Sequence, residues 1–234
     1  KKVTSSDVSY AVPRHDWVTG TVYDYYRGDY GATVNSATVT TIAGGTDMFA
    51  TTTKMYVRSS AGNVYKCMSN NSGAASTVEP SGTSTSEFTT GDDYVWKYMY
   101  SLTATETSNF LTTDFMAVHT DSTVSAAATN GSVLHYHIAN GGAGYTNGTY
   151  ATQTLRGDGA SATFTVIVSG GAVTSVVAAA AGTGYTFADC KIDSISGIGT
   201  PSTSAVVTPI IGPKGGHGKD AIEELGGFYV MTNS

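Results

Sequence analysis

A glycine-rich loop near the end of the sequence is its most suggestive chemical motif. Residues 212–220, GPKGGHGKD, place this loop directly before a helical segment, which is the setting of a phosphate-binding loop. The spacing does not fit, because five residues separate Gly212 from Gly218 and Asp220 stands where Ser or Thr would hold Mg²⁺. A carboxylate at that position would also repel phosphate. We interpret the motif as a structural loop whose glycines adopt backbone angles that other residues avoid.

Two further groupings invite a catalytic or metal-binding interpretation. His135 and His137 would share one face of a strand, but no Asp, Glu or Cys lies near enough in sequence to complete a metal shell. Asp92 and Asp93 are adjacent, whereas paired acids in glycoside hydrolysis need a defined separation, so we predict turn residues before a strand. Because the sequence also lacks a Gly-x-Ser-x-Gly elbow and a Cys with a convincing His partner, we predict no catalytic residues, metal or cofactor and a protein that is not an enzyme.

The composition limits the classes of partner. The 234-residue chain carries 12 Lys and Arg against 18 Asp and Glu, a net charge of −6. Nucleic-acid binding needs a basic stripe, which this sequence lacks, and no apolar run reaches the length of about 18 residues that a membrane span needs. Cys67 and Cys190 are expected to be reduced and to act as small apolar side chains. The chain opens at Lys1 without Met, as expected of a fragment.

The elements that would carry these residues are predicted to be strands. Tyr, Val and Thr are abundant, whereas Lys, Glu and Leu, which favour helices, are scarce. Residues 54–58 and 64–68 form a predicted hairpin around a five-residue loop, and residues 94–100 form an aromatic strand. A short helix is predicted at 220–225, with Asp220 as its N-cap, followed by a strand at 228–231.

Between these parts the sequence contains an internal repeat. The segment GGAGYT at 141–146 recurs as AGTGYT at 181–186, and a tight hairpin is expected around residues 169–171. Two copies are too few for a solenoid, so we predict a small inserted module. The predicted fold is all-β, mainly an antiparallel β-sandwich, with one short C-terminal helix and an inserted small β module. Its predicted boundaries are 1–130 for the first part of the main domain, 131–195 for the inserted Gly-Tyr-repeat module, and 196–234 for the return to the main domain.

Several segments resemble, in the same order, the baseplate wedge subunit eight of T-even-type contractile-tailed phages. They are VPRHDW at 12–17, NVYKC at 63–67, EPSG at 79–82 and GDDYVWKYMY at 91–100. The segment GGHGKD at 215–220 looks similar to cyanophage members. The Tyr-Val-Trp strand after the Glu-Pro turn is distinctive, whereas each short piece alone is not. The module of residues 132–191 departs from the family pattern, in which a different second domain is usual.

The resemblance implies a structural role in a virion. It implies a two-domain protein based on a β-sandwich, without a cofactor, that forms a homodimer within each wedge and contacts other baseplate wedge proteins. The expected location is the tail baseplate of the virion, assembled in the host cytoplasm, with neither nucleic-acid binding nor membrane insertion. We expect Trp17, Tyr25, Tyr26 and Trp96 to divide between core and interface. The alternative function is a carbohydrate- or receptor-binding β-sandwich module of a phage tail.

Overall fold

The chain folds into two units, which are described separately. The computed structural model describes residues 3–34 and 36–233. Unit 1 comprises the residues up to Ala128 and those from His217 on, and unit 2 comprises Thr129–Gly216. The second boundary thus lies at 216 and not at the predicted 195. The reason is that β15 (Val206–Ile211) pairs along its length with β9 (Val133–Asn140), which keeps residues 196–216 in the inserted unit.

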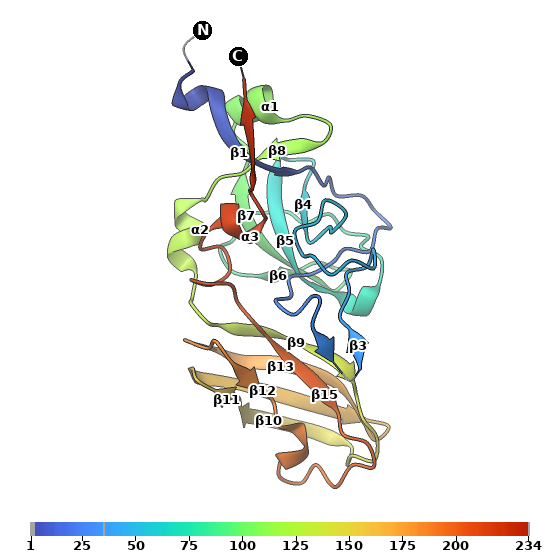
Figure 1. Ribbon diagram of the computed structural model, residues 1–234. Coiled ribbons are helices and arrows are strands. Elements are labelled where there is room, and N and C mark those ends of the chain that lie inside the picture. Colours follow the sequence, from blue (N-terminus) through green and yellow to red (C-terminus); the bar gives the residue numbers. More distant parts are fainter. Residues whose placement is uncertain (1–2, 35, 234) are drawn as a thin grey trace. The chain divides into compact units, whose positions relative to one another are not determined.

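Unit 1 is built around a four-stranded antiparallel sheet that is buried on both faces (Figure 1). Along its second strand, Val64 enters one apolar cluster while Tyr65 and Cys67 enter another on the opposite face. The predicted hairpin and the predicted aromatic strand are confirmed. The strands, in sheet order, are β4 (Tyr56–Arg58), β5 (Asn63–Asn70), β7 (Tyr94–Ser101) and β6 (Phe88–Thr89).

A second sheet in unit 1 joins segments from the two ends of the described chain. It has the order β16 (Tyr229–Thr232), β1 (Val8–Pro13) and β8 (Phe115–Ala117), with both pairings antiparallel. Figure 1 shows β1 and β16 side by side. The predicted last strand is therefore confirmed, and its pairing with β1 brings the segment that follows the insertion back onto unit 1.

In its described residues unit 1 contains three short helices, of which only the last was predicted. In α3 (Ala221–Glu224) the Asp220 carboxylate accepts hydrogen bonds from the backbone N–H groups of Ile222 and Glu223, as expected of an N-cap. The additional helices are α1 (Ala104–Phe110) and α2 (Ser122–Ala127). The smaller elements of unit 1 are β2 (Thr33–Val34), β3 (Ala37–Thr38) and 3₁₀ turns at Ser5–Asp7 and Asn71–Gly73.

Unit 2 is an antiparallel β module. The predicted tight hairpin is confirmed: Ser169 pairs with Ala172, and the intervening Gly170 and Gly171 have φ values of 62° and 79°, as a primed turn requires. The whole chain is accordingly all-β, with antiparallel sheets and few helices, as predicted. Unit 2 also contains β10 (Gly148–Thr154), β11 (Arg156–Gly157), β12 (Ala160–Ser169), β13 (Ala172–Thr183), β14 (Ala188–Asp189) and a 3₁₀ turn at Ile192–Ser194, with sheets β10-β12-β13, β15-β9 and β11-β14.

The repeated Gly-Tyr motif places two buried tyrosines in the core of unit 2. The hydroxyl of Tyr145 accepts a hydrogen bond of 2.7 Å from the backbone N–H of Ala205, and that of Tyr185 accepts one from Ala162. Glycine is needed beside each ring, because a Cβ at Gly159 would lie 2.4 Å from the Tyr185 ring. The repeated motif thus allows a large tyrosine ring to be buried while its hydroxyl group keeps a hydrogen-bond partner.

Substituting Gly159 should loosen unit 2 selectively. We expect Gly159→Ala to destabilise this unit by about 1–3 kcal/mol, because the new methyl group displaces the Tyr185 ring from a close-packed core. Hydrogen exchange resolved to peptides of residues 129–216 measures the effect. The matched control is Gly148→Ala, whose Cβ would meet the Tyr150 ring at an ordinary 3.6 Å. Both tryptophans lie in unit 1, so unchanged Trp fluorescence would show that unit 1 stays folded; equal exchange in the two variants would contradict the packing argument.

Candidate interaction surface

The four aromatic residues expected to divide between core and interface lie mostly in the core of unit 1. Trp96 is fully buried and stacks on Tyr94, with ring centroids 5.6 Å apart. Tyr26 is also buried. Trp17 and Tyr25 are half-buried and pack against the same cluster as Trp96. Trp96 is inaccessible to another chain because β7 is an interior strand with side chains covering both of its faces, and Tyr26 is inaccessible because it is buried.

Exposed apolar side chains gather instead on the sheet of β1 and β16. Tyr10 is 53% exposed and pairs directly with Val230, which is 60% exposed, so the two side chains lie next to each other on one face. Phe228 is 69% exposed just before β16, Val8 is exposed on the same face as Tyr10, and Tyr229 is exposed on the opposite face of the sheet. Large apolar groups concentrated on two adjacent strands mark a surface for contact with another molecule. We call this set the terminal-sheet patch.

The edge of this sheet carries none of the usual protections against strand pairing. β16 is the outer strand of the order β16-β1-β8. Residues 226–233, GGFYVMTN, contain neither a charged residue nor a proline. Natural edge strands are commonly guarded by Lys, Pro or a bulge, since their free N–H and C=O groups can otherwise pair with a further strand. The β16 edge is therefore suited to accept a strand from another chain.

Aromatic contacts hold the terminal-sheet patch against unit 1. The Tyr229 ring packs on Phe115 of β8, with centroids 4.9 Å apart. Phe228 meets Phe49 edge-to-face at 5.4 Å. Gly226, with φ of 74°, precedes them at a point where a Cβ would lie 2.7 Å from the Phe49 ring. The path of the chain into β16 is thus fixed by close packing.

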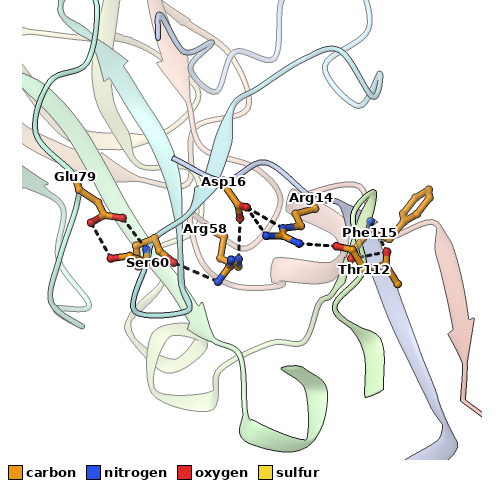
Figure 2. Close-up of polar contacts among 8 residues, drawn as sticks. Arg14, Asp16, Arg58, Ser60, Glu79, Thr112 and Phe115 are labelled. Atoms are coloured by element: carbon orange, nitrogen blue, oxygen red, sulfur yellow. Dashed lines mark hydrogen bonds and ion pairs between the residues drawn. The ribbon is translucent and has the colours of Figure 1, made fainter. Parts of the chain in front are cut away.

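A polar network fixes the opposite end of β1 (Figure 2). Arg14 donates from Nε to Asp16 Oδ2 at 2.9 Å, and Arg58 of β4 donates from Nε to Asp16 Oδ1 at 2.8 Å. Arg14 Nη1 also donates to the Thr112 carbonyl at 2.8 Å, and the Thr112 N–H donates to the Phe115 carbonyl. One carboxylate therefore connects β1, β4 and the loop that leads into β8. Figure 2 also shows Ser60, two positions after Arg58 in the chain, donating to the Glu79 carboxylate.

The network of Arg14, Arg58 and Asp16 has two positively charged groups and one negatively charged group. Partial burial raises the pKa of Asp16, but the hydrogen bonds from Arg14 and Arg58 outweigh it, and the pKa lies below its ordinary value of 3.8. The hydrogen bond to Asp16 raises the pKa of Arg14. Two guanidinium groups share one carboxylate, so the network stays ionised at neutral pH and contributes one net positive charge.

A small cavity lies between the start of β1 and α1. It has a volume of about 300 Å³, and its lining includes Ser9, Phe110 and the pair His119 and Glu106. His119 Nδ1 and Glu106 Oε1 are 2.7 Å apart. Glu106 also accepts from the backbone N–H and the hydroxyl of Thr103, which forms a capping box for α1. The pairing of His119 with Glu106 was not predicted from the sequence. The pattern Thr103-x-x-Glu106 is, however, a recognisable signal for the start of a helix.

Lys66 and Glu224 form an ion pair inside unit 1. The Lys66 side chain is 0% exposed and that of Glu224 is 3% exposed. Glu224 also accepts hydrogen bonds from the backbone N–H groups of Gly218, at 3.0 Å, and Asp220, at 3.2 Å. Burial lowers the pKa of Lys66, while the charge of Glu224 opposes the shift. Neither residue was singled out from the sequence.

The glycine-rich loop of 212–220 is a structural loop, as predicted. Gly215, Gly216 and Gly218 have φ values between 86° and 99°, and a Cβ at Gly218 would lie 2.6 Å from the side chain of Val124. The backbone at the end of this loop binds Glu224 of the protein itself. Cys67 and Cys190 are buried and free, as expected.

The sequence predicts neither a metal site nor a membrane span. Among residues 3–34 and 36–233, no three His, Cys, Asp or Glu side chains converge as a metal site would require, and His135 and His137 are half-buried on β9. None of the helices in the described part of the chain combines the length and apolar character needed to cross a membrane.

Comparisons of the chain with protein-family models, curated proteins and solved structures find no match. The likeness to wedge subunit eight therefore rests on the short segments quoted above, and what it implies about function is a proposal.

Removing the shared carboxylate should weaken the attachment of β1. We expect Asp16→Asn to lower the free energy of unfolding by up to about 1 kcal/mol at neutral pH, a modest value because the group is partly exposed and screened by solvent. The folded-state pKa of Asp16 is lowered, so its stabilisation is present above pH 3.8 and is lost as the pH falls through the lowered pKa.

Urea unfolding of both proteins at neutral and strongly acidic pH measures this difference, which should shrink on acidification. Asp114→Asn, at an exposed position near β8, is the control and should have almost no effect. A difference that grows with acidity would contradict the assignment of the stabilisation to ionised Asp16.

Proposed function

We propose that the protein is a structural subunit of a phage contractile-tail baseplate wedge that acts by packing against a second copy of itself and against neighbouring wedge proteins. The main support for this proposal is the terminal-sheet patch, where an uncharged edge strand and exposed aromatic side chains occur together. Such a surface is a liability in a monomer and an interface in an assembly. The ordered resemblance of residues 12–17, 63–67, 79–82 and 91–100 to wedge subunit eight supports the virion setting.

The second copy is the partner that best fits the edge of β16. An antiparallel pairing of β16 with its equivalent in another copy places the same uncharged residues on both sides of a two-fold axis. The chain carries a net charge of −6, so copies repel each other in general, but residues 226–233 bring no like charges together. Backbone hydrogen bonds would then extend the sheet, and Val230 would pack beside side chains of the partner strand.

A lysine on the edge strand should block this association. We expect the unmodified chain to form dimers at micromolar concentration and Val230→Lys to be monomeric, because pairing would place two ammonium groups close together. Light scattering coupled to size-exclusion chromatography measures the mass over a range of concentrations. Ile42→Lys is the matched control, since Ile42 is 54% exposed in unit 1 outside the patch, and it should remain dimeric. A monomeric unmodified chain, or dissociation by both variants, would contradict the assignment of the interface.

The baseplate role has a separate test. Tails purified from a phage that encodes this chain should contain it, and immunogold labelling should place it at the baseplate end. Its absence from intact tails would refute the wedge assignment even if the isolated chain dimerises. The alternative of a carbohydrate- or receptor-binding module predicts binding of the isolated chain to host glycans on an array, with no requirement for other tail proteins.

A further inference from the structure

A group of ionisable side chains is enclosed between the central sheet and the C-terminal segment of unit 1. Lys66 projects from β5, and Glu224 is the last residue of α3. They lie 158 positions apart in the sequence and contact each other through Nζ and Oε2. The ring of Tyr26 lies 5.0 Å from Lys66 Nζ and is in turn in edge-to-face contact with His217. The Tyr26 ring thus covers one side of Lys66 Nζ, and both side chains of the pair are buried from water.

An ion pair alone is a weak explanation for this arrangement. Removing two charges from water is costly, and an apolar pair of similar volume is often equally stable or more stable. A buried amine in contact with a carboxyl group could instead react with it. Buried groups whose ionisation is disturbed are common where a nucleophile must be kept uncharged.

We propose that Lys66 and Glu224 condense to form an intramolecular amide bond between β5 and α3. The assignment rests on the direct contact of an amine with a carboxyl group, on the exclusion of water around them, and on two backbone N–H donors aimed at the carboxyl oxygens. It goes beyond the proposed assembly function and does not depend on it.

The reaction is a condensation and needs no oxidant or reductant. A proton first moves from the Lys66 ammonium to the Glu224 carboxylate, which gives a neutral amine and a neutral acid. Nζ then attacks Cδ, so that a C–N bond forms. The C–O bond to the hydroxyl group breaks, and the hydroxyl leaves with one proton from Nζ as water.

The surrounding groups act on different steps, and the N–H donors that bind the Glu224 carboxylate oppose the first proton transfer. A poorly solvated site favours a neutral amine over an ammonium group. Burial lowers the pKa of Lys66, which is the direction that a nucleophilic amine requires. The N–H groups of Gly218 and Asp220 donate to the two oxygens of Glu224 and can hold the negative charge that develops on oxygen in the tetrahedral intermediate. Excluding water afterwards protects the amide from hydrolysis.

The mass of the purified, denatured full-length chain tests the proposal. We expect a mass lower than that of the sequence by one molecule of water. After trypsin digestion, the bond should appear as a branched peptide that joins residues 59–97 to residues 220–234, because trypsin does not cleave after an acylated Lys66. A full-length mass equal to that of the sequence would show an ion pair only and would overturn the proposal.

Matched variants locate the bond. Lys66→Arg retains the positive charge but should lose the mass deficit, whereas Lys97→Arg, at the position paired with Lys66 on β7, should retain it. Glu224→Gln should lose ammonia in place of water and give a product of the same mass as the unmodified chain after its reaction. A water loss that persists in Lys66→Arg, or a branch at Lys97, would place the chemistry elsewhere and overturn the assignment.

Discussion

Unit 1 depends on the return of the C-terminal segment after an insertion of nearly ninety residues. Two of the interactions that hold this segment in place are the pairing of β16 with β1 and the burial of Glu224 against Lys66 of β5. The backbone N–H groups of the loop before α3 also point to the same carboxylate. The contact between Lys66 and Glu224 therefore fixes where α3 lies against β5 of the central sheet. A misplaced α3 would leave Lys66 charged and unpaired in an apolar environment, at a cost of several kcal/mol.

The packing of the interior of unit 2 depends on glycine residues and not on charged side chains. The stretch from Gly159 to Phe187 contains no charged residue, and its core relies on strands packed by Phe164, Val166 and the two repeat tyrosines. Because a buried tyrosine must satisfy its hydroxyl, each ring is placed where a backbone N–H can reach it. Glycine beside the ring then lets the backbone approach closely. The motif therefore recurs because the same packing problem occurs twice.

Local patterns explain which parts of the fold could be predicted. The aromatic strand at 94–100, the Gly-Gly hairpin and the Asp220 cap depend on neighbouring residues, and the structure contains all three. The second boundary could not be predicted in this way, because β15 belongs to unit 2 through pairing with a strand more than sixty residues earlier. The helix at 104–110 was missed although its capping box is visible, since its apolar periodicity is short.

The same distinction between local and distant information applies to the candidate interface. Trp is a residue type that is common at interfaces. Trp96 is nevertheless a core residue, because its strand β7 lies between β5 and β6, and this position follows only from the sheet order. Residues 228–231 look like any apolar strand in sequence. They become a candidate surface only because β16 lies at an edge with nothing beyond it in the described part of the chain. Apolar character therefore identifies which residues avoid water, and topology decides whether they do so within the chain or against another one.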